Sequence, residues 1–143
     1  MSTPRPYRVV LDTNVVLDLL HFLDATVLPI RRAIDERRAQ CYASQSTLSE
    51  FRRVLAYPEF ALARETQADL LMQYQSWINL APDLAYAYPK LPRCTDPDDQ
   101  MFLALAASVS ADFLISKDKA LLALKRRVSD FRILMPEEAA NFL

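Results

Sequence analysis

The chain has 143 residues, with 17 basic and 18 acidic side chains, and it contains no glycine. Its formal charge of -1 provides no whole-molecule positive field that would attract nucleic acid or an anionic membrane, so any attraction for phosphate must come from a local patch or a bound cation. The lack of glycine argues against P-loop nucleotide hydrolysis, Rossmann redox chemistry and α/β-hydrolase chemistry, because each needs glycine where the backbone approaches phosphate or turns sharply.

The first half of the chain alternates short apolar segments with amphipathic ones. Residues 7–11 form an apolar run that ends at Asp12, which predicts a strand buried on both faces, as in a parallel sheet. Apolar side chains at helical spacing follow at once. The pattern predicts helices over 14–22 and 26–38, a strand over 40–43, and helices over 47–56 and 65–78.

The second half continues the same alternation. The pattern predicts a short strand over 84–88, an apolar central helix over 99–110, a strand over 113–115, a helix over 119–125, a strand over 131–134 and a closing helical turn over 137–142. Strands that alternate with helices imply right-handed crossovers and a covered parallel sheet. We therefore expect an α/β fold, a three-layer α/β/α sandwich with a central parallel sheet of four to five strands, formed by residues 1–143 as one domain.

The apolar runs and the cysteines of the sequence predict the cellular compartment. No apolar run approaches the roughly 18 residues needed to span a bilayer, and the start of the chain leads straight into a strand. Cys41, Cys94 and the single His21 make no zinc-site spacing, so we expect two reduced cysteines. These features favour a cytoplasmic protein with no membrane partner.

Four acidic residues are predicted to lie where ligands bind in such sheets, at the carboxyl ends of the strands. Asp12 ends the first strand, and Glu50 falls in the first turn of the helix after the second strand. Asp99 begins the central helix, and Asp118 lies just beyond the strand over 113–115. Although they are far apart in sequence, these side chains could meet at one edge of the sheet.

Each acid also has a local structural explanation. Thr47 and Glu50 fit a capping box, and Asp96-Pro97 resembles a helix start with Asp96 as the cap. Asp118 and Asp12 could cap the helices that follow them. Taken singly, Glu50, Asp99 and Asp118 are therefore ambiguous, whereas an aspartate that closes a nearly all-apolar strand, as Asp12 does, has few structural explanations.

Taken together, the four carboxylates would repel one another by about 4 kcal/mol per pair at 4 Å and an effective dielectric near 20, so a cation must neutralise them. Hard oxygen ligands suit Mg²⁺ or Mn²⁺ and not zinc. Such ions lower the pKa of a bound water and stabilise the oxygens of an in-line phosphodiester displacement. The sequence therefore predicts a metal-dependent nuclease.

The same residues also resemble a known family, the PIN-domain ribonucleases, and within it the toxins of bacterial toxin-antitoxin pairs of the VapC type. The resemblance rests on four segments in the family's order, over 9–15, 46–55, 94–103 and 111–122. It implies an α/β/α sandwich, Mg²⁺- or Mn²⁺-dependent cleavage of RNA, a homodimer, and inhibition by a cognate antitoxin protein.

The resemblance carries over to individual positions. Asp12, Glu50, Asp99 and Asp118 match the family's acidic catalytic and metal-binding residues, and two polar residues match its supporting positions. These two are Asn14 and Ser116. Asp96 and Asp98 are alternative metal ligands, because the rotation of the helix decides which acid of that run points inward. The chain departs from the pattern at Lys117, where relatives often carry glycine before the final acid.

Three further hypotheses concern the substrate and the rival functions. Arg52 and Arg53 lie one helical turn past Glu50 and could contact an RNA backbone. A rival enzyme is a phosphatase that uses Asp12 as its nucleophile. That chemistry usually needs a second aspartate two residues on, so Asn14 argues against it. The alternative from another class is a catalytically silent PIN-like module that binds protein or RNA and whose acids serve only as helix caps.

Overall fold

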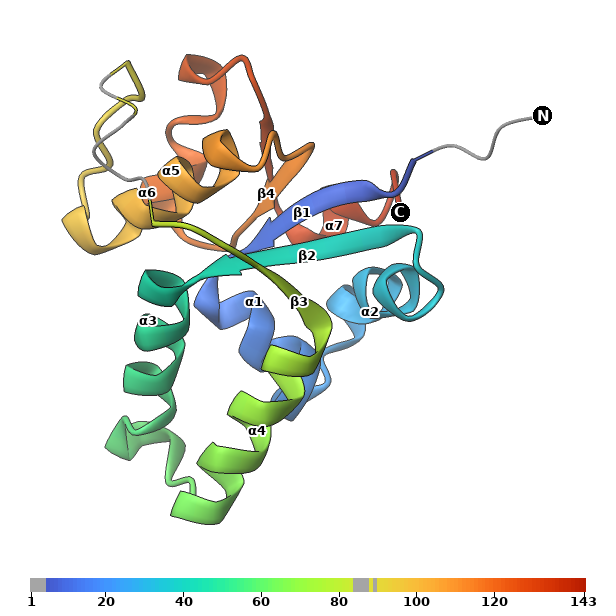
Figure 1. The fold of residues 1–143 in the computed structure, drawn as a ribbon, viewed down its shortest axis with the longest axis vertical. Helices are drawn as coiled ribbons and strands as arrows, with labels where there is room; N and C mark the ends of the chain where they lie inside the picture. The colour runs from blue at the N-terminus through green and yellow to red at the C-terminus, as the bar shows by residue number, and fades with distance from the viewer. Residues whose placement is uncertain (1–4, 84–87, 89) are drawn as a thin grey trace.

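The fold is built on a sheet of five parallel strands in the order β3-β2-β1-β4-β5 (Figure 1). The computed structural model describes residues 5–83, 88 and 90–143. The strands are β1 (Tyr7–Leu11), β2 (Ala39–Ser44), β3 (Ile78–Ala81), β4 (Phe113–Ile115) and β5 (Arg132–Leu134). The strands predicted over 7–11 and 113–115 are confirmed with the same bounds, and the parallel sheet of four to five strands is confirmed with five.

The register places the carboxyl ends of the two central strands side by side. β1 pairs with β4 so that Leu11 lies opposite Ile115. The backbone N–H of Asp12 then donates to the carbonyl oxygen of Ile115 at 3.0 Å. Asp12 and Ser116, the first residues after these strands, are therefore neighbours at the same edge. Figure 1 shows the arrowheads of β1 and β2 pointing to this edge, near the start of α3.

Helices from both ends of the chain cover one face of the sheet. They are α1 (Thr13–Leu17), a π-helical turn (Asp18–Phe22), a 3-10 turn (Ala25–Val27), α2 (Leu28–Asp35), α3 (Gln45–Leu55), a 3-10 turn (Pro58–Phe60), α4 (Arg64–Trp77) and α7 (Pro136–Ala139). The side chains of Val9 and Leu11 from β1, and of Phe113 and Ile115 from β4, point into the apolar core on this face.

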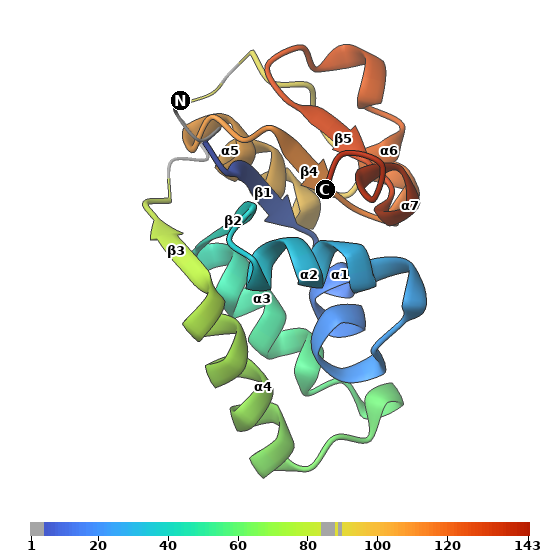
Figure 2. The same cartoon turned by 90° about the vertical axis from the view of Figure 1, so that its right-hand side faces the viewer.

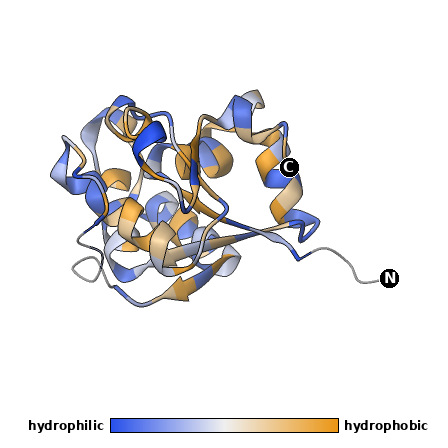
Figure 3. Ribbon diagram, turned by 90° about the horizontal axis from the view of Figure 1, so that it is seen from above, coloured by the Kyte–Doolittle hydropathy of each residue, from blue (hydrophilic) through white to orange (hydrophobic). Residues whose placement is uncertain are grey.

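The opposite face carries α5 and α6. This layer consists of a 3-10 turn (Pro97–Asp99), α5 (Gln100–Ser108), α6 (Lys119–Leu122) and a 3-10 turn (Lys125–Arg127). Val10, Leu114 and Ile133 point into its core, so neighbouring residues of each strand face opposite layers. Figure 2 shows the sheet between the two helical layers, which confirms the α/β/α sandwich. The outer helices carry both hydrophobic and hydrophilic residues (Figure 3).

Two sequence-based element boundaries were wrong. α3 begins at Gln45 with Ser44 as its N-cap, and the capping box joins Ser44 to Thr47. Glu50 therefore lies in the second turn and not in the first, and it takes no part in that capping box. The helix predicted to end at 78 ends at Trp77, and Ile78 starts β3 with an extended backbone. The strand predicted over 84–88 falls largely outside the described residues.

The remaining predicted helices are divided or shorter. The helix predicted over 14–22 is α1 followed by the π-helical turn, and the one over 26–38 is a 3-10 turn followed by α2. The helix over 119–125 is α6 and a separate 3-10 turn, and the last one is reduced to α7. By length and composition no single described helix could cross a membrane, although the bent pair Thr13–Phe22 and Ala25–Asp35 passes that test together.

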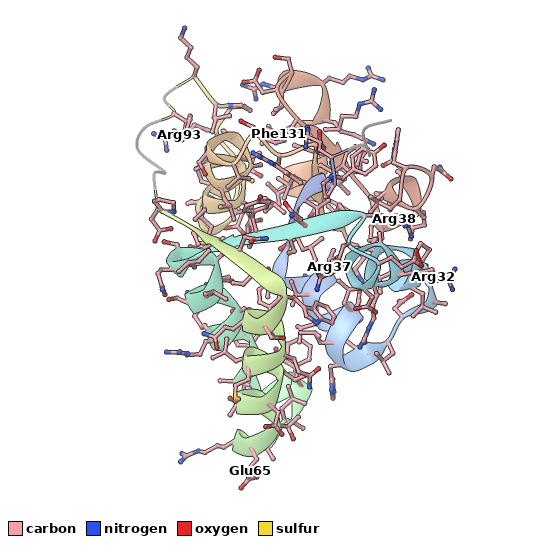
Figure 4. All side chains as sticks on the ribbon, turned by 45° about the vertical axis from the view of Figure 1, so that its right-hand side comes forward. Arg32, Arg37, Arg38, Glu65, Arg93 and Phe131 are labelled. Atoms are coloured by element: carbon pink, nitrogen blue, oxygen red, sulfur yellow. The ribbon has the colours of Figure 1, made fainter. Side chains whose placement is uncertain are left out.

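A basic group lies away from the carboxyl edge of the sheet. Arg37 and Arg38 form the turn between α2 and the start of β2, and Arg32 lies nearby on α2 (Figure 4). The amino end of β2 is the end opposite to Ser44, where α3 begins. Arg37 and Arg38 therefore lie at the opposite end of the sheet from Asp12.

Candidate active site at the carboxyl edge of the sheet

Asp12 is a buried carboxylate at the end of the central strand. Its side chain is 4% exposed and does not cap α1 through the helix's inner N–H groups. Burial raises the pKa of Asp12, while the Ser116 hydroxyl and the Thr13 backbone N–H oppose that shift. The negative charges of Asp118 and Glu50 raise it further. The cap explanation predicted as an alternative for Asp12 therefore lacks the hydrogen bond that it needs.

Ser116 connects Asp12 to Asp118 by hydrogen bonds. Its fully buried hydroxyl donates to Oδ2 of Asp12 at 2.7 Å and accepts from the backbone N–H of Asp118 at 2.9 Å. Its own N–H donates to the carbonyl oxygen of Leu134 at 2.9 Å. Ser116 thus fixes the orientation of the Asp12 carboxylate and the start of the loop that carries Asp118.

Three carboxylates lie close together next to Asp12 and Ser116. Single oxygens of Asp96, Asp99 and Asp118 all lie within 4.8 Å of one another. Asp118 also caps α6 by accepting from the N–H of Ala120 at 2.7 Å, and Asp96 accepts from the N–H of Asp98 at 3.0 Å. The local capping roles proposed for these two acids are therefore real, but they leave further carboxylate oxygens available to a ligand.

Asp99 has the most unfavourable electrostatic surroundings of this group. Among the described residues, its Oδ2 is buried and has no hydrogen-bond donor. Burial, the adjacent carboxyl group of Asp118 and the charges of Asp12 and Asp96 raise the pKa of Asp99 to about 8. At neutral pH, this carboxyl group needs either a proton or a cation beside it. A divalent cation therefore fits the donor set, which consists of oxygen atoms only.

Glu50 faces the site but is held by an arginine. It forms an ion pair with Arg53, one turn further along α3, and its charge acts on Asp12. Arg53 also lies 3.8 Å from Oδ2 of Asp98. Asp98 is thus directed toward Arg53, whereas Asp96 and Asp99 face Asp118. Glu50 does not belong to the group of three carboxylates that the structure brings closest together.

The remaining predicted site residues are not among the three clustered carboxylates. Asn14 is exposed in the first turn of α1. Arg52 lines a surface pocket of about 350 Å³ together with Arg64 of α4, whereas Arg53 points toward Glu50 and Asp98. The two adjacent arginines therefore serve different surfaces.

Sequence reasoning missed a further buried acid near the site. Asp18 lies in the π-helical turn after α1 and forms an ion pair with Lys117. The signal was present in the sequence, because Asp18 interrupts the apolar run from Val15 to Leu20. A buried acid in such a run needs a cationic partner, which sequence spacing alone does not identify.

Comparison with known proteins places the chain in a family. A model of the PIN domain family matches residues 8–120. Among curated protein sequences, no significant match was found.

Solved structures share the fold at low sequence identity. VapBC2 from Rickettsia felis, bound to a DNA fragment from their promoter, superposes with a TM-score of 0.66 and 12% identity over 90% of this chain and 98% of that one. PAE2754 from Pyrobaculum aerophilum gives 0.62 and 16% over 95% and 94%. FitAB bound to an IR36 DNA fragment gives 0.55 and 17% over 90% and 95%.

The two findings agree with each other. The family model runs from β1 into α6, so it spans Asp12, Glu50, Asp99 and Asp118. The structural similarities, at these identities, show a common fold. The chain belongs to the PIN domain family.

Proposed function

We propose that the protein is a metal-dependent endoribonuclease that hydrolyses RNA phosphodiester bonds with Asp12, Glu50, Asp99 and Asp118, and that residues 1–143 act as one nuclease domain. The observation that carries this proposal is the gathering of Asp99, Asp118 and Asp96 next to buried Asp12. A cluster of this charge is unfavourable without a cation, and PIN domains are generally nucleases.

The proposed ligands are Asp12, Asp99 and Asp118, with Glu50 completing the set and Asp96 as an additional donor. When bound, Mg²⁺ or Mn²⁺ supplies charge stabilisation to the phosphodiester oxygens and lowers the pKa of water. Oδ2 of Asp99 supports this assignment, because it is buried and has no donor within the described part of the chain, which makes it a ready ligand.

The protein's own residues orient the site. Ser116 holds the Asp12 carboxylate in place through its hydroxyl, and the cap at Ala120 holds that of Asp118. Asn14 is proposed as a polar supporting residue at the exposed rim. Arg53 neutralises Glu50, and its exposed guanidinium is proposed to contact a phosphate group of RNA that passes that residue.

A cellular role is proposed from the same comparisons. The neighbours VapBC2 and FitAB are complexes that were solved with DNA. We propose that this chain, whose sequence resembles toxins of the VapC type, is the toxin of a toxin-antitoxin pair, that it is inhibited by a cognate antitoxin, and that it acts as a homodimer on RNA in the cytoplasm. The two reduced, buried cysteines agree with that compartment.

The decisive experiment incubates the purified protein with single-stranded RNA and Mn²⁺, with and without a chelator. We expect cleavage that the chelator abolishes and that Asp12→Asn lowers by at least about a hundredfold, because the change removes one charge from the proposed cation site. Asp35→Asn is the matched control, since Asp35 is an exposed acid on α2. Cleavage that persists in Asp12→Asn would mean a contaminant or a different mechanism.

The same assay tests the second candidate, a catalytically silent binding module. This alternative is favoured by the capping bonds of Asp96 and Asp118, which give both acids a structural role. Failure of the wild-type protein to cleave any RNA, while it still binds RNA or a partner protein, would favour the module.

The proposed RNA contacts can be tested separately with the acidic site unaltered and with Ca²⁺ in place of Mn²⁺, on RNA that a gel shows to be intact. We expect Arg53→Ala to weaken RNA binding and to reduce the slope of log affinity against log salt by about one, because one phosphate contact is lost. Arg52→Ala should have a smaller effect, since Arg52 lies toward α4. An unchanged salt slope in the double variant would remove both arginines from the proposed RNA surface.

A further inference from the structure

The ion pair between Lys117 and Asp18 ties two segments of the candidate site together. The ammonium group of Lys117 contacts Oδ2 of Asp18, whose side chain is only 9% exposed. Asp18 lies in the π-helical turn that continues α1, the helix that starts directly after Asp12. Lys117 lies in the loop between β4 and α6. The contact therefore joins the segment that follows Asp12 to the loop that carries Asp118.

Lys117 stands between the two residues that shape this loop. Ser116 on one side donates to Asp12, and Asp118 on the other side donates its N–H to Ser116 and caps α6. The hydrogen bonds of Ser116 fix the start of the loop, and the cap fixes its end. The Lys117 side chain adds a contact from the middle of the loop to the neighbouring helical segment.

The backbone does not explain the choice of lysine at this position. The described residues with left-handed backbone are Leu23, Arg37, Ala61 and Ser110, and Lys117 is not among them. The loop therefore forms without the conformational freedom that glycine would provide. The charge of the side chain has a clear use instead, because a buried carboxylate such as that of Asp18 is costly unless it is paired.

We propose that Lys117 is a positioning residue of the acidic site: by pairing with buried Asp18, it holds the Ser116–Asp118 loop against the segment after Asp12 and so sets the position of Asp118 relative to Asp12. The consequence for cation binding rests on the proposed function. The positioning of the loop does not, and it can be measured in the metal-free protein.

The test compares three variants with the wild type. Lys117→Arg keeps the positive charge and the ion pair. Lys117→Met removes the charge and leaves Asp18 buried without a partner, whereas Lys117→Met/Asp18→Asn removes both charges. Asp24→Asn is the matched control, because Asp24 is an exposed acid whose pKa is lowered chiefly by hydrogen bonds from Thr26 and to a smaller extent by the charge of Lys117.

Two quantities are measured besides thermal stability. The first is the hydrogen exchange of the Asp118 and Ala120 amides in metal-free protein, since both amides donate to side chains of this loop. The second is the Kd for Mn²⁺ alone, measured by calorimetry. In Lys117→Met and in the double variant, we expect exchange about tenfold faster and a Kd about tenfold higher, a change typical of residues that support metal ligands.

The double variant separates positioning from stability. We expect its thermal stability to recover relative to Lys117→Met, because no unpaired charge stays buried. Its exchange rates and Kd should stay altered, and Lys117→Arg and Asp24→Asn should match the wild type. The proposal is overturned if exchange at Asp118 and Ala120 is unchanged in the double variant or recovers together with stability. If exchange changes but the wild type binds no Mn²⁺, the proposed function fails and the positioning role stands.

Discussion

Asp99 is the residue whose environment says most about the site. In the metal-free protein, its carboxyl group is surrounded by Asp118, Asp12 and Asp96, and its pKa is raised to about 8 from the ordinary 3.8. Between these two values, the folded state holds a proton that the unfolded state has lost. The free energy of unfolding must therefore fall as the pH rises from about 4 to about 8, and this contribution is fully present only below the lower value.

We expect Asp99→Asn to flatten this pH dependence and to be more stable than the wild type at pH 8 in chelator, because it removes a buried charge. The same variant should lose the increase in melting temperature that Mn²⁺ gives the wild type, since a proposed ligand is gone. Thermal melts between pH 5 and pH 8, with Mn²⁺ or with chelator, measure both effects. Asp35→Asn should keep both the wild-type slope and the Mn²⁺ response. An Asp99→Asn slope equal to that of the wild type would contradict the assignment of this proton to Asp99.

Sequence alone could single out Asp12 but could not complete its surroundings. An aspartate that closes an apolar strand has few structural explanations, so its prediction depended only on local pattern. Which of Asp96, Asp98 and Asp99 face Asp118 could not be predicted in this way, because their orientation depends on the path of the turn before α5. The pairing of Lys117 with Asp18 joins residues 99 positions apart, and no local pattern records it.

At the scale of elements, the chain ends helices without glycine. α5 ends in a Schellman motif, in which the N–H of Ala111 donates to Ala106 and that of Ser110 donates to Ala107. Ser110 takes the left-handed conformation that this motif requires, with φ of 53°. A residue with a Cβ atom is strained in that conformation, whereas glycine is not.

We therefore expect Ser110→Gly to stabilise the protein by about 0.5–1 kcal/mol, against the usual effect of introducing glycine. Ser108→Gly, within the last turn of the same helix, should destabilise it by about 0.5–1 kcal/mol. Urea denaturation of the two variants side by side checks the prediction. A loss of stability at Ser110 as large as that at Ser108 would show that the left-handed conformation is not strained.

The elements that sequence patterns located well are those buried on both faces. β1 and β4 are mostly apolar, and their bounds were predicted correctly. β3 was missed because it is an edge strand that starts directly after α4, with two of its four residues exposed and no turn residue before it. The start of α3 was misplaced because Ser44 and Thr47 each fit a capping pattern, and only the structure shows that Ser44 is the cap.

At the scale of the whole molecule, the alternation of elements predicted the layers but not the order of the strands. Parallel β1 lies between β2 and β4, which brings the ends of strands about a hundred residues apart in sequence to one edge. The net charge of -1 hides a separation of charge, with carboxylates at that edge and Arg37 and Arg38 at the other end of β2. Under the proposed function, RNA would therefore be attracted to the acidic edge chiefly by a bound cation and by Arg53.

The central claim is that the carboxylates at the edge of the sheet share a divalent cation. Anomalous scattering from a crystal of the wild-type protein grown with Mn²⁺ tests it most directly. We predict an anomalous peak coordinated by Asp12, Asp99 and Asp118, and its loss in Asp12→Asn crystals grown in the same way. A wild-type crystal with no peak at this edge, or with one bound only by the exposed Asp98, would contradict the account.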